Sequence, residues 1–477
     1  MDTKKLRQKV LDLAIHGKLV KQDPNDEPAS ILLDHIRAEK ARLVKEGKIK
    51  KSDLVEKPIS EEEIPFEVPE GWEWCRLAAI INMLSGQDFA PSKYNDKGLG
   101  IPYITGASNI QDAKILVNRW TETPTVIAKQ NDLLIVCKGS GVGKMAICNI
   151  EQAHIARQIQ ALRNTYKLTD LHYIKYVIEV NLRPIISNAN GIIPGLPRDI
   201  LLDLILPLPP LAEQHRIVKA VDELFEQIDI IERSERELEE AANKTRDKLL
   251  NLAIQGHLVP QDPNEEPASV LLERIRAEKA RLVKEGKLKK KDLEEKPISP
   301  DEIPFDIPEG WVWTCMKECN YFMSSQEDPT KNPEKQYELY SVPTFETGMP
   351  EFIKGKEISS SKVIVQKNDV LLCKINPHLN RSWVVCHYNE DLPCIASSEW
   401  IVFRNHNIYP KYLRYCFISP YFKNLMMSNV SGVGGSLMRA QPVSVAKYLF
   451  PLPPLSEQRR IVTKLEELLQ EIDKLKA

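Results

Sequence analysis

LPLPPLAEQHRIVKAVDELFEQID, from Leu206 to Asp229, returns near the end of the chain as FPLPPLSEQRRIVTKLEELLQEID, from Phe450 to Asp473. A second pair of matching segments is longer. Residues 5–74 recur as residues 244–313 without a gap, and roughly three positions in four are identical. The two matches have offsets of 244 and 239 residues, so the intervening stretch is five residues longer in the second copy. The chain is therefore an internal duplication in which like segments alternate with two unlike ones.

The same offsets relate the two ends of the chain to each other. Ala477 corresponds to Arg233 in the first copy, and Met1 corresponds to Glu240 in the second. Only residues 234–239 lack a counterpart. The sequence is thus a closed two-fold repeat that is cut open inside one of its helices.

A long helix with one apolar stripe follows the first proline pair. Pro209 and Pro210 precede it and Gly256 follows it, which gives about 45 residues and a length of about 65 Å. Apolar positions recur at alternating steps of four and three, as in a coiled-coil seam that is interrupted at Glu235 and weakened at Thr245. These positions are Ile217, Val221, Leu224, Ile228, Ile231, Leu238, Ala242, Leu249 and Leu252.

A second stripe of the same kind is split between the two ends of the chain. Two-fold symmetry would place it antiparallel to the long helix, as the partner that an apolar stripe needs. The alternative is that both stripes pack on a globular domain. The second stripe consists of Ile461, Leu465, Leu468, Ile472 and Leu475 near the C-terminus, and Leu6, Val10 and Leu13 near the N-terminus.

One charged helix follows the N-terminal stripe and another follows the long helix, over residues 29–51 and 268–290. In the first copy only a narrow apolar edge is evident, formed by Ile31, Leu32, Ile36 and Leu43. This predicts a solvated arm that touches another subunit or phosphates, and a plain surface helix is the alternative.

The two unlike segments, 75–206 and 314–449, predict two α+β domains of one fold with diverged surfaces. Short β-rich runs alternate with turns and helix-like stretches in both, and each contains an Asn-Asp-apolar-Leu strand followed by a loop with lysine. The predicted organisation is a helical segment and connector at 1–74, the first variable domain at 75–206, a central helix, arm and connector at 207–313, the second variable domain at 314–449, and a C-terminal helix at 450–477.

Charge and composition narrow the function classes. The net charge is −2, but the first variable segment carries 14 basic and 10 acidic residues, the second carries 15 and 12, and the remainder carries 36 and 45. This segregation gives weak support for nucleic-acid binding by the variable segments. The charged N-terminus and the lack of a long apolar run predict a cytoplasmic protein. The nine cysteines follow no zinc-site spacing, so reduced structural thiols and no metal are expected.

Several motifs suggest catalysis but fail on spacing. KGSGVGKM, from Lys138 to Met145, lacks the first glycine and the Ser or Thr of a phosphate-binding loop. The stretch from Asn376 to Leu379 lacks the second proline and the aromatic residue of an amino-methyltransferase loop. Glu46-Gly47-Lys48 has no acidic partner at a fixed distance that would support a nuclease. The sequence therefore predicts no catalytic residues and no enzyme activity.

The layout resembles the specificity subunit of type I restriction-modification enzymes. PLPPLAEQHRIV at 207–218 and PLPPLSEQRRIV at 451–462 carry the resemblance, together with NDLLIVCKGSGVGKMAI at 131–147. The resemblance implies two target recognition domains that each read one half of a split DNA sequence, with two long antiparallel coiled-coil helices as spacer. It also implies docking of two adenine methyltransferase subunits, which would bring S-adenosylmethionine, and of motor and nuclease subunits for restriction in bacterial defence. No cofactor is expected in this chain.

Two other functions fit the sequence less well. One is the same role in a related bipartite system whose methyltransferase and nuclease are fused. The other is a coiled-coil scaffold without affinity for DNA.

Loop residues of the variable domains are the candidates for DNA contact. Lysine, arginine and asparagine can hold phosphates or read base edges, although ordinary surface side chains look the same in sequence. The second loop departs from the glycine pattern, with residues 376–381 reading NPHLNR. The candidates are Lys138, Ser140, Lys144 and Arg198 in the first domain, and Lys374, Asn376, Arg381 and Arg439 in the second.

Overall fold

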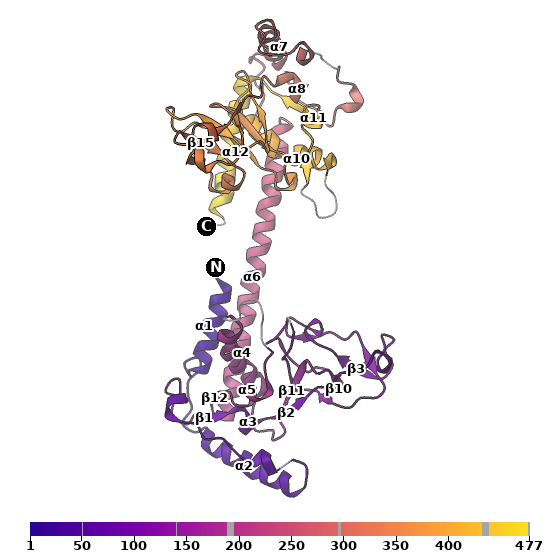
Figure 1. Ribbon diagram of the computed structural model, residues 1–477, viewed down its shortest axis with the longest axis vertical. Coiled ribbons are helices and arrows are strands. Elements are labelled where there is room, and N and C mark those ends of the chain that lie inside the picture. Colours follow the sequence, from indigo (N-terminus) through magenta and orange to yellow (C-terminus); the bar gives the residue numbers. More distant parts are fainter. Residues whose placement is uncertain (50, 140, 188–194, 294–296, 432–437, 476–477) are drawn as a thin grey trace. The chain divides into compact units, whose positions relative to one another are not determined.

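A computed structural model describes residues 1–49, 51–139, 141–187, 195–293, 297–431 and 438–475. The chain divides into two compact α+β units, Met1–Ser234 and Glu235–Ala477 (Figure 1). The division falls within helix α6 (Leu211–Ile254). It coincides with residues 234–239, the stretch that has no counterpart in the duplication.

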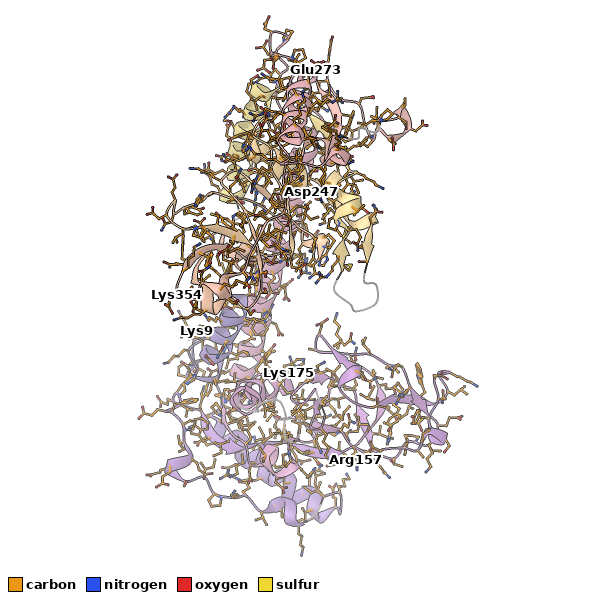
Figure 2. The ribbon with its side chains drawn as sticks, turned by 45° about the horizontal axis from the view of Figure 1, so that its top comes forward. Lys9, Arg157, Lys175, Asp247, Glu273 and Lys354 are labelled. Atoms are coloured by element: carbon orange, nitrogen blue, oxygen red, sulfur yellow. The ribbon has the colours of Figure 1, made fainter. Side chains whose placement is uncertain are left out.

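The first unit combines a helical part with a part made of sheets. Figure 1 shows α1 and α4 beside the first part of α6, and Figure 2 marks Lys175 on α4 and Arg157 in the sheet part. The helices are α1 (Thr3–Ile15), α2 (Ala29–Lys45), α3 (Leu77–Ile80), α4 (Leu171–Ser187), α5 (Arg198–Leu202) and the first part of α6.

Two four-stranded sheets form the first variable domain, in the orders β2-β11-β8-β9 and β6-β3-β10-β7. All neighbours are antiparallel except β3 and β10, which run parallel. Two strand pairs, β1-β12 and β4-β5, lie outside these sheets. The strands are β1 (Glu73–Arg76), β2 (Asn82–Ser85), β3 (Ile101–Ile104), β4 (Ile110–Gln111), β5 (Lys114–Ile115), β6 (Trp120–Thr121), β7 (Ile127–Lys129), β8 (Leu133–Val136), β9 (Met145–Ile147), β10 (Gln152–Ile155), β11 (Ile159–Arg163) and β12 (Ile205–Leu208).

The second unit repeats this plan with altered sheets, in the orders β14-β17-β20-β15-β16 and β19-β18-β21. As in the first unit, one parallel pair, β15 and β20, lies among antiparallel ones. The strands are β13 (Val312–Cys315), β14 (Gln326–Glu327), β15 (Gln336–Tyr340), β16 (Glu351–Lys354), β17 (Lys362–Ile364), β18 (Val370–Cys373), β19 (Ser382–Val384), β20 (Cys394–Ala396), β21 (Trp400–Phe403), β22 (Val430–Ser431), β23 (Arg439–Ala440) and β24 (Leu449–Leu452). The helices are α7 (Ala268–Lys284), α8 (Met316–Cys319), α9 (Pro410–Ile418), α10 (Pro420–Ser428), α11 (Pro442–Val445), α12 (Leu455–Lys474) and the second part of α6.

The Asn-Asp pair before β8 and before β18 has one structural role in both domains. Asn131 and Asn368 adopt left-handed φ values of 70° and 73°, which asparagine tolerates better than most residues. The buried Asp132 carboxylate then pairs with Arg163 at 2.6 Å, and Asp369 pairs with Arg404 at the same distance. The pair thus turns the chain into the central strand and ties that strand to its neighbour.

The repeated PLPPLxEQ motif fixes each long helix to the base of its variable domain. Its first residues form β12 and β24, which pair with β1 and β13. The buried Glu213 carboxylate accepts hydrogen bonds from Trp72 Nε1 and Gln22 Nε2, both at 3.0 Å. In the second unit, Glu457 accepts from Trp311 and Gln261, both at 2.9 Å.

Burial raises the pKa of both motif carboxyls, Glu213 and Glu457. The glutamine that follows is buried too: Gln214 Oε1 accepts from the backbone N–H of Asp170, and Gln458 Oε1 accepts from that of Tyr409. We call these two sets of contacts the repeated network. In each unit it joins the connector, the strand pair (β1-β12 or β13-β24) and the long helix.

The apolar stripe of α6 is buried only in part. Ile217, Val221 and Ile228 are buried in a core that includes α1 and α4, whereas Leu224 is 39% exposed. Tyr176 of α4 also donates a hydrogen bond to Asp222, so the variable domain supplies some of the packing. Within each unit the stripe therefore packs on a domain helix as well as on the terminal helix.

In the second unit, Leu250 and Ile254 of α6 pack with Ile461 and Leu465 of α12. Four expected seam residues are exposed: Leu6 at 37%, Leu224 at 39%, Leu238 at 44% and Leu475 at 68%. Leu6 and Leu475 are near chain ends, where few neighbours are available to cover a side chain.

Helix α2 is more deeply embedded than a solvated arm. Ile31, expected on the apolar edge, is 44% exposed, whereas Leu33 is buried. Lys40 is also buried, and its Nζ donates to the backbone carbonyl of Ala78 at 3.0 Å. The copy repeats this contact, because Lys279 Nζ donates to the carbonyl of Lys317, the counterpart of Ala78, and also to that of Glu318 at 3.1 Å. Each arm is therefore attached to the first short helix of its variable domain.

None of the helices within the described residues is long and apolar enough to cross a membrane.

Candidate nucleic-acid interface

The loop between β8 and β9 is a tight turn with basic residues at both ends. Gly139 and Gly143 have φ values of 89° and 87°, which L side chains rarely adopt. The loop closes where the Val136 N–H donates to the Lys144 carbonyl at 2.9 Å. Lys138 and Lys144 are exposed on either side of it. Ser140 lies outside the described residues.

The loop between β18 and β19 has the same backbone despite its different sequence. Asn376 and Asn380, with φ values of 46° and 51°, take the places of the two glycines. The Cys373 N–H donates to the Arg381 carbonyl at 3.0 Å, as Val136 does to Lys144. The second loop therefore departs from the glycine pattern in sequence but keeps the positive φ values. The two asparagines have the same spacing as the two glycines, and this spacing could have predicted the turn. We call these two segments, residues 137–144 and 374–381, the basic loops.

The backbone pairing gives residue-by-residue equivalence between the basic loops. Lys144 and Arg381 occupy the same position, directly before the strand that leaves each loop. The other lysine is displaced by one residue, because Lys374 occupies the position of the buried Cys137. Each basic loop thus keeps two cationic side chains and places one of them differently.

A more distant segment joins each basic loop. The Leu196 N–H donates to the Cys137 carbonyl at 2.7 Å, and the Ala440 N–H donates to the Lys374 carbonyl at 2.8 Å. Arg439 therefore lies beside the second loop, where its guanidinium forms an ion pair with Glu399 at 3.2 Å. The structure brings together all four candidates of the second domain.

Arg198 is the candidate that fits the first loop least well. It begins α5, and its Nη1 donates to the Met83 carbonyl at 2.9 Å and to Ser85 Oγ at 3.2 Å. It also lines a cavity of about 960 Å³ between α2, α3 and α5. Its guanidinium is thus engaged by β2 and does not lie in the basic loop.

Two polar residues beside the loops were not singled out from the sequence. The Cys137 N–H donates to the Gln158 carbonyl at 2.7 Å, and the Lys374 N–H donates to the Glu399 carbonyl at 3.0 Å. Gln158 and Glu399 are therefore equivalent. Gln158 follows β10, whereas its loop follows β8; Glu399 follows β20, whereas its loop follows β18. No local motif marks them, because only the strand pairing brings them to the loop.

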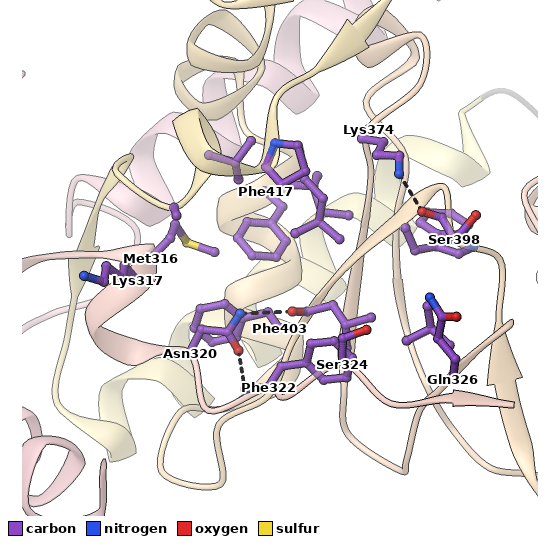
Figure 3. A pocket seen from close by; sticks show the side chains of 18 residues that line it. Met316, Lys317, Asn320, Phe322, Ser324, Gln326, Lys374, Ser398, Phe403 and Phe417 are labelled. Carbon is purple, nitrogen blue, oxygen red and sulfur yellow. Dashed lines mark hydrogen bonds between the residues drawn. The ribbon is translucent and has the colours of Figure 1, made fainter. Parts of the chain in front are cut away.

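The second basic loop is partly neutralised. Lys374 Nζ donates to the Ser398 carbonyl at 2.7 Å and lies 3.8 Å from Glu399 (Figure 3). Lys374 lines a cavity of about 390 Å³ with Asn320 and Phe322. Arg381 Nε is buried and has no hydrogen-bond partner among the described residues. The second loop therefore has the hydrogen-bond donors Lys374 and Arg381, with one carboxylate acceptor, Glu399, beside it.

The chemistry of both loops suits recognition more than catalysis. Positive-φ turns let a backbone approach a ligand closely, and lysine and arginine neutralise phosphates. Glutamine pairs with adenine and glutamate accepts from the cytosine amino group in the major groove. The two loops, with Gln158 and Glu399 beside them, therefore carry side chains of the kinds that bind phosphates and base edges in other proteins.

Comparison with known proteins shows the family of the chain. The family model described as type I restriction modification DNA specificity domain matches residues 69–240 and 312–477, one match in each half of the chain. The EcoAI specificity subunit from Escherichia coli is 31% identical over 99% of this chain and 90% of its own length. The EcoEI specificity subunit from the same organism is 30% identical over the same shares.

Among solved structures, the HsdS subunit from Thermoanaerobacter tengcongensis aligns over 49% of this chain and 50% of its own, with 23% identity and a TM-score of 0.32. The sequence comparisons are the stronger result, since one spans the whole chain and the other finds both halves. With its two basic loops and its repeated network, the chain belongs to the family of type I restriction enzyme specificity subunits.

Proposed function

We propose that each basic loop contacts DNA and that each variable domain reads one half of a split target. The observation that carries this proposal is the equivalence of the loops, in which one backbone turn presents different side chains. Lys144 and Arg381 share a position, whereas Gln158 is replaced by Glu399. If the two turns share a backbone but carry different base-reading side chains, the two half-sites would differ in sequence. The whole target would then not be palindromic.

The coarser function follows from the family. The chain is the specificity subunit, which recognises the DNA target and works with modification and restriction subunits; it does not itself catalyse their reactions. Methylation of adenine at N6 with S-adenosylmethionine would take place in a partner methyltransferase, and this chain would need no cofactor.

Two methyltransferase subunits would dock on the two matching surfaces that the buried repeated network holds in place. Its hydrogen bonds differ by about 0.1 Å between the units, with Trp72 to Glu213 at 3.0 Å and Trp311 to Glu457 at 2.9 Å. Two rigid surfaces of the same construction are what two identical partners need. The motor and nuclease subunits would join this assembly for restriction.

Helix α6 would act as the spacer, with α1 and α12 running antiparallel to it. Its 44 residues continue without a break from one variable domain to the other. Seven residues inserted near Glu235, with a matching extension of the partner helix, should lengthen the gap between the half-sites by about 10 Å, or about three base pairs. Methylome sequencing measures this gap directly. An unchanged gap would show that the helices do not set the spacing.

Selection from random-sequence DNA tests the reading of DNA itself. The full chain with its methyltransferase should enrich one gapped motif. Lys144→Ala should weaken binding to all sequences and lower the dependence of log K on log salt by about one. Lys97→Ala, on an exposed lysine outside the basic loop, is the matched control. Absence of any enriched motif would favour a scaffold without DNA affinity.

Modularity is tested by exchanging residues 75–206 for another domain of this type. One half of the selected motif should change while the other half stays the same. A change in both halves would contradict the assignment of one half-site to each domain.

A further inference from the structure

The second variable domain contains a compact group of three metal-ligating side chains, Glu338, His387 and Cys394. One ligand atom from each lies within 4.8 Å of the others. Glu338 is on β15 and Cys394 on the neighbouring strand β20, where the two residues are directly paired. His387 lies in the loop that connects β19 to β20. We propose that these three residues bind one zinc ion, which fastens this loop to the sheet.

The donor set suits zinc. Zinc sites in proteins combine thiolate, imidazole and carboxylate ligands, and a site with three protein ligands leaves a fourth position for water. Ligand atoms of a tetrahedral zinc site are about 3.5 Å apart, so the group needs to contract by about 1 Å to close around an ion. The partly exposed His387 provides the side from which an ion can enter.

The histidine is held as metal-binding histidines usually are. Its Nε2 lies 2.9 Å from the Leu392 carbonyl, which can only accept a hydrogen bond. In the neutral ring this contact puts the proton on Nε2 and leaves the lone pair on Nδ1. Donation of the other ring N–H to a backbone carbonyl is the usual arrangement that orients a histidine ligand. His387 also has a φ of 55°, a strained value for a residue other than glycine.

The carboxylate lacks a cation. Glu338 is fully buried and accepts hydrogen bonds from Tyr340 Oη at 2.7 Å and from the backbone N–H groups of Tyr388 and Asn389, both at 3.1 Å. Across the described part of the chain, no lysine or arginine forms an ion pair with it. Burial of a carboxylate with neutral donors alone is costly. A bound cation would offset that cost.

The first variable domain shows that the fold does not require polar residues here. The Ala156 N–H donates to Ile104, as the Ser397 N–H does to Tyr340, which aligns the two parallel strand pairs. With this register, the residues at the positions of Glu338 and Cys394 are Pro102 and Ala153.

Ile150 corresponds to His387 by the same reasoning, because each follows by two residues the backbone contact at Cys148 or Val385. None of the three residues in the first domain can bind a metal. The connection to the next strand is also shorter there, with five residues from Cys148 to Ala153 against nine from Val385 to Cys394. A zinc ion would hold the longer connection in place.

Binding releases one proton from the thiol of Cys394, since zinc is bound by the thiolate. Zinc affinity should therefore fall as the pH is lowered.

Zinc content tests the proposal. The full chain, stripped with a chelator, incubated with zinc chloride and dialysed, should retain one zinc per chain by elemental analysis. Its melting temperature should rise by about 5 °C over the stripped protein. Cys394→Ser and His387→Asn should lose the zinc and the rise. Asparagine is chosen because it accepts a left-handed φ.

Cys386→Ser is the matched control, because Cys386 is an exposed thiol directly before His387. It should retain one zinc, and its loss of zinc would overturn the ligand set stated above. A variant that fails to fold is recognised by a melting temperature below that of the stripped wild type. Cobalt then decides, since a thiolate-to-cobalt absorption band should appear both in the wild type and in Cys386→Ser, which leaves Cys394 as the thiolate of the group. A wild type without zinc and without that band, or variants that bind zinc equally well, would overturn the proposal.

Discussion

The repeated network and the basic loops each occur once in both units, yet the two copies have diverged to different degrees. In the network, residue identities and contacts are both kept: Glu213 and Glu457 each accept from one tryptophan and one glutamine. In the loops, only the backbone is kept, and two glycines are replaced by two asparagines. A buried carboxylate tolerates few changes of partner, whereas an exposed turn needs only residues that accept its φ values.

The same contrast holds inside the variable domains. The Asp-Arg pair beside the central strand has equal distances of 2.6 Å in both units. The polar group around Glu338 has no equivalent in the first domain. Side chains that stabilise the fold are thus the same in both domains, whereas side chains near the loops and connections differ.

The largest expected effect comes from breaking the shared pair. Asp132→Ala and Asp369→Ala each remove the carboxylate that pairs with a part-buried arginine and accepts from a backbone N–H, and each should destabilise its domain by about 3 kcal/mol. Calorimetric unfolding measures the loss. Similar losses in the two variants would support one fold for both domains, and a loss below about 1 kcal/mol in one of them would contradict the shared role.

The next effect concerns the residues that differ. Gln158→Glu and Glu399→Gln exchange the side chains found at one position in the two domains. Each should change the preferred base at one position of one half-site, with a discrimination of about 2 kcal/mol. Sequencing of DNA selected by the two variants measures this preference. If either exchange leaves the selected motif unchanged, these residues do not read bases.

The smallest effect is a pH dependence that comes from His172 in the first unit. A hydrogen bond to the Asp170 carboxylate raises the pKa of His172 above 6.5, with Asp222 acting in the same direction and Lys175 against it. His215 also faces Asp170, at 3.8 Å. The stabilisation by His172 is therefore complete below about pH 6.5 and is lost as the pH rises through the raised pKa.

In the second unit the position of His172 is taken by Lys411, which pairs with Glu466 at 2.9 Å. His172→Gln should lower the melting temperature at about pH 5.5 and leave it unchanged at about pH 8.5. Because the ring is 51% exposed, the effect should be below about 1 kcal/mol. Equal melting curves of wild type and variant at both pH values would contradict it.

Local sequence patterns predicted many of the elements. The proline pair and Gly256 predicted the limits of α6, which spans Leu211–Ile254. The Asn-Asp runs predicted the central strands β8 and β18. The domain limits at 75–206 and 314–449 stay a prediction, although the ribbons β1-β12 and β13-β24 lie at these limits. The eight residues chosen for DNA contact stay a prediction as well.

Other features could not be read from the chain alone. Leu32, Ile36 and Leu43 of the expected apolar edge of α2 are buried, and Ile31 is exposed. The burial of Lys40 was not predicted, because it depends on a carbonyl 38 residues away. Gln158 and Glu399 reach the basic loops only through strand pairing. The zinc-site spacing rules examine cysteines and histidines that are close in sequence, whereas Glu338 and Cys394 are 56 residues apart and face each other across two parallel strands.

The sequence by itself determined the duplication, the family and the helices, because repeats and helical periodicity are written along the chain. The tertiary structure decided which side chains share a site, since that depends on strand register and on loops that bring distant residues within hydrogen-bonding distance. Two asparagines could replace two glycines for the same reason: the turn requires a backbone conformation, and more than one residue type accepts it.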